Sequence, residues 1–399
     1  MPKKMNDRTL LTHAAVNPAE HHGFINPAIY RGSTVAFPNV AALAGRTQPY
    51  RYGRWGNPTS TALCEAINAL EGAIGTVLCP SGLTACTTAI LAVCGAGDHL
   101  LVPDSVYGPV RHFCDTAARR MDIQTTYYDP RVGAGIAELL QPNTRAVFLE
   151  SPGSGTFEIQ DVPVIAAIAH ERDICVLMDN SWETPLFLKP LELGVDLSIM
   201  AATKYIGGHS DVMLGTIACG PRAWEQVRDM HFQLGQYVGP DDVTLVLRGL
   251  RTLDVRLQRH QESALTIAHW LEQRPEVSRV FYPALPSHPD HALWQRDFRG
   301  ASGLLSFVTR SPSSDVVAAM IDGLKLFTIG YSWGGFESLA LPVDPRSMRT
   351  ATQWTETGHL IRLHIGLEDV DDLMADLEGG FSRLRAIATQ KNLRQTGHA

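Results

Sequence analysis

The chain has 399 residues, 45% of them hydrophobic, and a formal net charge of −7, an ordinary composition for a globular protein of two or three domains. No block of Lys or Arg stands out, so we expect neither nucleic acid nor a membrane surface as a partner. The N-terminus lacks the apolar run of a secretory signal, and the seven cysteines form no C-x-x-C pair, which argues against disulfides and zinc and favours the cytoplasm.

Residues 1–55 are rich in Pro and Gly, and we predict an irregular, extended segment with little core of its own. Such a segment is expected to contact a neighbouring subunit. A helix is predicted to follow from Thr59, because Leu63, Ile67 and Leu70 fall on one helical face.

Short apolar runs then alternate with helical patterns up to about residue 245. Strands are predicted at 76–79, 100–103, 146–149, 174–178 and 197–200, and one of the intervening helices at 164–171. Alternation of this kind is typical of a mainly parallel sheet covered by helices on both faces. We therefore predict an α/β domain over residues 56–247.

The pattern changes after Arg248. A long helix is predicted over 250–273, a strand over 303–308, a helix over 315–322, a short strand near Phe327 and a closing helix over 370–388. These elements indicate a smaller α+β domain over residues 248–399.

Two polar side chains follow buried strands of the predicted sheet. Asp179 ends one strand, and Lys204 lies in the loop after the next. Because ligands bind at the carboxyl ends of parallel strands, both side chains could face one pocket. A surface lysine and a helix N-cap are the ordinary structural alternatives.

Other segments have the composition of anion sites. The turn at Ser81 and Gly82, between a strand and a helix, could present N–H groups to a phosphate, or be a plain turn. No G-x-G-x-x-G or Walker pattern occurs, so dinucleotides and ATP are not expected. Arg362 alternates with apolar residues in a strand pattern and needs either a substrate carboxylate or an internal one.

The segments YRYGRWGNPT, MDNSWETP, ATKYIGGHSD and RLHIGLED together are highly specific. With them the chain resembles the Cys/Met-metabolism family of pyridoxal-5′-phosphate (PLP) enzymes, over nearly its whole length. The resemblance implies PLP fold-type I, the aspartate-aminotransferase-like architecture. It also implies a homotetramer built from dimers and a small thioether amino acid as substrate.

The resemblance implies roles for individual residues. Lys204 would bind PLP covalently, Asp179 would pair with the pyridine nitrogen, and Tyr107 would stack on the ring. These three are the implied catalytic residues. Arg362 would bind the substrate carboxylate, and Ser154 would also face the substrate.

The phosphate of PLP has its own implied set of residues. The backbone at Gly82 and Leu83 and the hydroxyl of Thr203 would hold it within one chain. Tyr52 and Arg54 would reach the phosphate of a neighbouring subunit.

Three positions depart from the family's common pattern. Ala201 stands where many members have a phosphate-binding Ser, and Ser154 where many have Asn. Pro109 stands where methionine γ-lyases carry a Cys, which counts against that activity.

The segment at Tyr331, Ser332 and Trp333 separates subtypes, because bacterial cystathionine β-lyases resemble it while γ-acting relatives carry S-L-G-G-x-E-S-L. We therefore expect substrate-binding side chains here and a β-lyase that converts L-cystathionine to homocysteine, pyruvate and ammonia in methionine biosynthesis. Lys204 would remove the Cα proton, and Lys204 or Tyr107 would protonate the leaving thiolate. The alternatives are a γ-acting relative, such as cystathionine γ-synthase, γ-lyase or O-acetylhomoserine sulfhydrylase, and a non-enzymatic PLP-fold regulator.

Overall fold

This computed structural model describes residues 5–311 and 313–396 of the chain, which form two β-sheets with their own helices. The larger sheet has seven strands in the order β1-β7-β6-β5-β4-β2-β3. The strands are β1 Gly75–Cys79, β2 His99–Pro103, β3 Gln124–Tyr128, β4 Thr144–Glu150, β5 Cys175–Asp179, β6 Leu197–Ala201 and β7 Gly215–Cys219.

Only β7 runs against its neighbours in this sheet, pairing antiparallel with both β1 and β6. The pairs β6–β5, β5–β4, β4–β2 and β2–β3 are parallel. The predicted mainly parallel sheet is confirmed, although β3 and β7 are additional strands. Because six strands share one direction, their carboxyl ends meet at one edge of the sheet.

Helices cover both faces of the large sheet. One face packs against α4 (Gly82–Val93), α5 (Gly108–Phe113) and α8 (Trp224–Gln233). The other face packs against α3 (Pro58–Glu71) and α9 (Pro240–Leu250) at one end and α6 (Val162–His170) at the other. With both faces covered, most of the strands are largely apolar, as expected for buried parallel strands, whereas the edge strand β3 is polar and partly exposed.

The smaller sheet is antiparallel, with four strands in the order β10-β11-β9-β8. These are β8 Val277–Phe281, β9 Leu304–Thr309, β10 Leu339–Val343 and β11 Leu360–His364. Its core includes residues of α10 (Leu253–Glu272), α12 (Ser314–Asp322) and α13 (Val370–Thr396). Two further short helices are α7 (Thr184–Phe187) and α11 (His291–Asp297). The predicted smaller α+β domain is thus confirmed.

The strand predicted near Phe327 is wrong. Thr328 makes only an isolated bridge with Leu339. The preceding backbone N–H groups, including that of Phe327, donate to the carboxylate of Asp376 on α13 instead of to a strand. Phe327 is buried, so its apolar side chain reflects the core and not a sheet.

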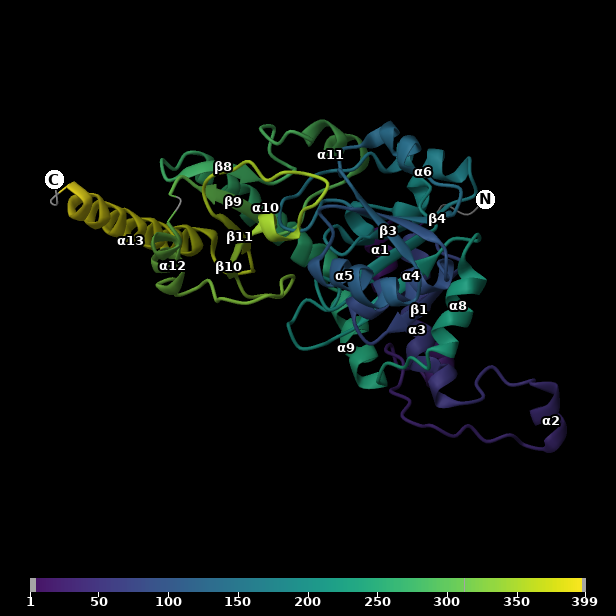
Figure 1. The fold of residues 1–399 in the computed structure, drawn as a ribbon. Coiled ribbons are helices and arrows are strands. Elements are labelled where there is room, and N and C mark those ends of the chain that lie inside the picture. Colours follow the sequence, from purple (N-terminus) through teal and green to yellow (C-terminus); the bar gives the residue numbers. More distant parts are fainter. Residues whose placement is uncertain (1–4, 312, 397–399) are drawn as a thin grey trace.

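The N-terminal segment is more ordered than predicted. Helix α1 (Asp7–His13) buries Leu10 and Leu11 in a cluster shared with α3 and α10, so this part has a core contact within the chain. Helix α2 (Val40–Gly45) buries no residue and lies on an arm that extends away from the large sheet (Figure 1). Among the described residues, no helix combines the length and apolarity that crossing a membrane requires.

Candidate active site

A cavity of about 450 Å³ lies at the carboxyl edge of the large sheet, where β1, β6, β5, β4 and β2 end. The smaller domain contributes Arg362 on β11 and the loop that precedes β10. Eleven residues predicted from the sequence line it together: Gly82, Leu83, Tyr107, Ser154, Asp179, Thr203, Lys204, Tyr331, Ser332, Trp333 and Arg362.

Lys204 lies in the turn after β6, with its amine in the cavity. Its Nζ donates a hydrogen bond to Oγ of Ser332 at 2.9 Å and lies 5.1 Å from the centre of the Trp333 ring. Burial, together with the nearby charge of Arg362, lowers the pKa of Lys204 to about 8, against the opposing effect of Asp179. An amine with this pKa is partly neutral near pH 7 to 8, as a general base must be.

The loop that carries Ser332 and Trp333 is hydrogen-bonded to side chains on one face of β11. Arg362 Nη2 donates to the carbonyl of Tyr331 at 2.7 Å, and the N–H of Gly334 donates to Nε2 of His364 at 3.1 Å. Gly334 has a φ of +86°, and a Cβ there would lie 2.7 Å from the backbone nitrogen of Tyr205. Only glycine therefore lets this loop approach the backbone that follows Lys204.

Asp179 ends β5 and is half-buried, with its carboxylate on the lining of the cavity. One oxygen accepts from the N–H of Ser181 at 2.9 Å, and the thiol of Cys86 approaches the other at 3.7 Å. Burial raises the pKa of Asp179, while the hydrogen bonds of Ser181 and Cys86 and the charge of Lys204 oppose this rise. A partly buried carboxylate of this kind favours a cationic N–H donor beside it.

Sequence reasoning missed a second carboxyl group, that of Glu150. It ends β4 directly beside Asp179 in the strand register, and its Oε2 accepts from the N–H of Tyr107 at 2.7 Å. Burial and the neighbouring Asp179 raise the pKa of Glu150 well above its ordinary value, against the opposing effect of the hydrogen bond from Tyr107. Its position at the end of a buried strand is the signal that identified Asp179, and it could have found Glu150 as well.

Cys86 was also missed, because nothing marks it within the pattern of α4. Its thiol is buried, and burial with the charge of Asp179 raises its pKa well above the ordinary value. It is therefore a neutral hydrogen-bond partner of Asp179 and not a nucleophile.

The turn at the start of α4 has the form of an anion cradle. The side chain of Ser81 caps the helix by accepting from the N–H of Thr84 at 3.1 Å. A Cβ on Gly82 would lie 2.5 Å from the Cβ of Ala201, so the backbone here fits directly onto the end of β6. Two residues after Ala201, Thr203 Oγ1 exchanges hydrogen bonds with the backbone of Leu214.

Tyr52 and Arg54 do not join Lys204 within one chain. Arg54 donates to the carbonyl of Phe232 at 3.0 Å and lines a different cavity, between α3 and α8. Tyr52 is 43% exposed. The prediction for these residues concerns the cavity of a neighbouring subunit, and it stays a prediction.

Residues 8–382 match the family model described as Cys/Met metabolism PLP-dependent enzyme. The chain belongs to this family. A cystathionine beta-lyase of Escherichia coli is 44% identical over 94% of this chain and 98% of its own length. A cystathionine beta-lyase of Haemophilus influenzae is 42% identical over 96% of this chain and 100% of its own.

The fold agrees with solved structures of the same family. A crystal structure of cystathionine gamma synthase from Xanthomonas oryzae pv. oryzae, in complex with aminoacrylate and cysteine, superposes with a TM-score of 0.88. It is 34% identical and covers 96% of this chain and 100% of that one. The predicted fold-type I architecture is thereby confirmed.

PLP is the cofactor of this family, and the cavity fits it. The amine of Lys204 and the half-buried carboxylate of Asp179 are on its lining, as is the Gly82 turn at the N-terminus of α4. The amine suits the aldehyde of PLP, the carboxylate suits its pyridine nitrogen, and the turn at the helix N-terminus suits its phosphate.

Proposed function

We propose that this chain is a PLP-dependent carbon–sulfur β-lyase that cleaves L-cystathionine to homocysteine, pyruvate and ammonia. The observation that carries the proposal is the hydrogen bond between Lys204 and Ser332 in a cavity that also contains Trp333 and Arg362. The names of the two bacterial relatives support the same substrate and reaction.

Four side chains would hold the cofactor and the substrate. Lys204 would bind PLP, Asp179 would hold its pyridine nitrogen protonated, and Tyr107, which is 44% exposed, would cover the ring. Arg362 would grip the α-carboxylate with the donors that it does not use on the loop carbonyls. PLP, when bound, supplies the electron sink for the pair of electrons left on Cα.

Lys204 is the base and the acid of the proposed reaction. Released from the cofactor by the incoming amine of the substrate, its neutral amine would take the proton from Cα, and the Cα electron pair would form a double bond to Cβ as the bond from Cβ to sulfur breaks. The protonated amine, oriented by Ser332 and facing the Trp333 ring, returns the proton to the thiolate. Water hydrolyses the released enamine to pyruvate and ammonia.

The wider assignment has the same status as the reaction. We infer other cysteine S-conjugates as further substrates, a place in methionine biosynthesis, the cytoplasm as the location, and a homotetramer. In such an assembly Tyr52 and Arg54 would complete the phosphate site of the neighbouring subunit. Their separation from Lys204 within one chain agrees with this arrangement.

A γ-acting enzyme is the competing assignment, because the cystathionine gamma synthase from Xanthomonas shares the fold. The keto acid formed from L-cystathionine separates the two: β-elimination gives pyruvate, whereas γ-elimination gives 2-oxobutyrate. The purified, PLP-loaded enzyme should form pyruvate and a free thiol in equal amounts, and Lys204→Ala is the control for background. Formation of 2-oxobutyrate, or no keto acid at all, would refute the β-lyase assignment.

A further inference from the structure

Asp104 lies directly after β2, three residues before Tyr107, and its side chain is fully buried. Its carboxylate accepts from the backbone N–H groups of Thr350, Ala351 and Thr352, at 2.9, 3.1 and 2.7 Å. The Thr352 hydroxyl donates to it at 2.7 Å, and Arg111 forms an ion pair with it at 3.1 Å. One carboxylate of the large domain thus accepts hydrogen bonds from three successive backbone N–H groups of the smaller domain.

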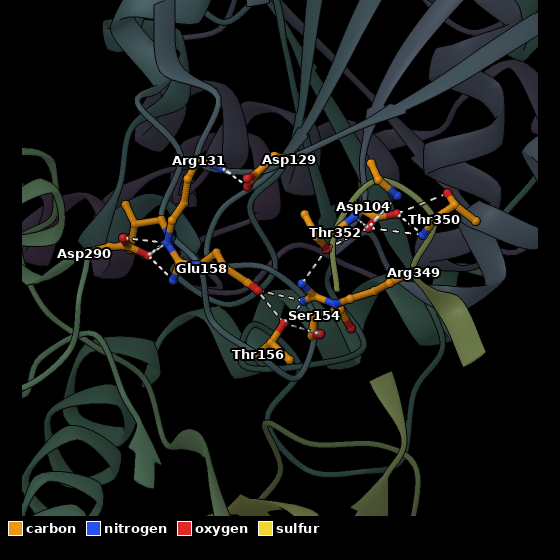
Figure 2. A network of polar contacts seen from close by, with 12 residues as sticks. Asp104, Asp129, Arg131, Ser154, Thr156, Glu158, Asp290, Arg349, Thr350 and Thr352 are labelled. Atoms are coloured by element: carbon orange, nitrogen blue, oxygen red, sulfur yellow. Dashed lines mark hydrogen bonds and ion pairs between the residues drawn. The ribbon is translucent and has the colours of Figure 1, made fainter. Parts of the chain in front are cut away.

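Arg349 makes a second attachment in the same segment. Its Nη2 donates to Oε1 of Glu158 at 2.7 Å and to the hydroxyl of Thr156 at 2.6 Å. Both side chains of the ion pair are buried, at 8% and 5% exposure. Arg349 Nη1 also donates to the Thr352 hydroxyl at 3.0 Å, so Thr352 joins the Asp104 and Glu158 attachments (Figure 2).

Both attachment points belong to loops that line the active-site cavity. The N–H of Ser154 donates to the carbonyl of Ser105 at 2.8 Å, and the N–H of Gly153 donates to the carbonyl of Glu158 at 2.9 Å. A Cβ on Gly153 would lie 2.4 Å from Oγ of Ser105, so the two loops pack closely with no room for a side chain at this position. The loop of Tyr107 and the loop of Ser154 therefore form one unit.

The attaching segment lies in the connection between β10 and β11, residues 344–359, which includes the short 3-10 helix η6 (Pro345–Met348). Connections of this length are uncommon in compact domains and usually have a function. The strand that follows carries Arg362. The segment therefore ties the strand that carries Arg362 to the loops of Tyr107 and Ser154, which line the same cavity.

We propose that residues 349–352, through Asp104 and Glu158, are a positioning clasp that sets Tyr107 and Ser154 at a fixed distance from Arg362. None of the five charged or hydroxyl side chains of the clasp lines the cavity, so they act through these loops and are positioning residues. Buried charges that are fully hydrogen-bonded hold one geometry, because any shift leaves a charge unpaired. The effect on substrate affinity rests on the β-lyase assignment, whereas the effect on loop order does not.

Thr352→Val tests the clasp, because it removes the hydroxyl that links Asp104 to Arg349 and keeps the side-chain shape. We expect KM for L-cystathionine to rise about tenfold with little change in kcat, from the loss of hydrogen bonds to charged groups. Thr352→Ser retains the hydroxyl and should restore the wild-type KM. Thr309→Val is the matched control, since Thr309 also donates and accepts hydrogen bonds in the smaller domain but none of them reaches the cavity loops.

Hydrogen–deuterium exchange of the holoenzyme gives a readout that needs no turnover. Thr352→Val should speed exchange in peptides that span 104–113 and 153–158, and Thr352→Ser and Thr309→Val should not. Asp104→Asn should do so more strongly, if it folds. Unchanged exchange in these peptides for Thr352→Val would overturn the clasp, whatever the substrate. A wild-type enzyme that forms no pyruvate would instead refute the β-lyase assignment and leave the exchange result to decide on the clasp.

Discussion

Arg362→Leu is the substitution that tests substrate binding most directly. Arg362 lies on β11 beside the amine of Lys204, close enough to lower its pKa, and its side chain reaches the cavity. Its Nη2 is used on the carbonyls of Tyr331 and Ser332, and a guanidinium has further N–H donors in a planar fork. A substrate carboxylate can take two of these donors at once.

The expected magnitude follows from these two bonds. Each hydrogen bond to a charged group contributes about 1.5–3 kcal/mol, so losing two costs about 3–6 kcal/mol. That corresponds to a fall of about 10²–10⁴ in kcat/KM. Arg362→Lys keeps the charge but not the fork, and it should recover only part of the loss.

The assay must separate the loss of the carboxylate contact from a displaced loop, because Arg362 also holds the carbonyl of Tyr331. Pyruvate formation is therefore measured with cystathionine and with its α-carboxamide. The wild type should strongly prefer the acid, and Arg362→Leu should treat the two alike. If the variant kept the wild-type preference, Arg362 would not be the carboxylate ligand.

Three further predictions concern the same site and two buried histidines. Lys204→Ala should abolish turnover and the visible absorbance of the bound cofactor, and a variant that retains that band rules out Lys204 as the covalent anchor. Asp179→Asn should lower kcat by about 10²–10³ in the pyruvate assay, as loss of one buried electrostatic partner does, and near-normal turnover would refute its role. Burial lowers the pKa of His260 and His288 to about 4. The folded pKa lies below the ordinary 6.5, so the unfolded chain binds protons more readily than the folded chain between pH 6.5 and pH 4. The free energy of unfolding is therefore unaffected above pH 6.5 and falls as pH drops towards 4, by about 1.4 kcal/mol per pH unit for each histidine. Thermal unfolding at pH 7.5 and pH 5 measures this loss by comparison, because other buried groups such as Glu71, whose pKa burial raises to about 7, titrate in the same window with the opposite sign. The melting temperature of His260→Gln and of His288→Gln should fall less between the two pH values than that of the wild type; an equal fall would contradict the prediction.

The strands of the large sheet that the sequence predicts are apolar and largely buried, although the equally buried strand β7 was missed. The predicted run 100–103 lies within β2 and 146–149 within β4, and both strands are apolar because helices cover the sheet on each side. Strand β3 was missed because it is an edge strand with partly exposed, polar residues and no apolar run. Phe327 shows the reverse error, since a buried aromatic residue need not lie in a strand.

The position of site residues was predictable where they follow parallel strands. Asp179 and Lys204 meet because β5 and β6 are parallel neighbours, which the alternation of elements already indicates. The link between Lys204 and Ser332 spans 128 positions and depends on the packing of two sheets, so no local pattern reveals it. The resemblance to the family identified Ser332 where local reasoning could not.

The division into domains at residues 247 and 248 stays a prediction, yet it bears on how the site works. The amine of Lys204 and the carboxylate of Asp179 come from strand ends of the large sheet, whereas Arg362 and Ser332 come from the smaller one. A substrate held by Arg362 therefore presents its Cα to Lys204 only if the two sheets keep one mutual placement. Because a misplacement of 1 Å can cost about a hundredfold in rate, contacts far from the reacting atoms must fix it. The hydrogen bonds from residues 350–352 to Asp104 cross this division, where such contacts are needed.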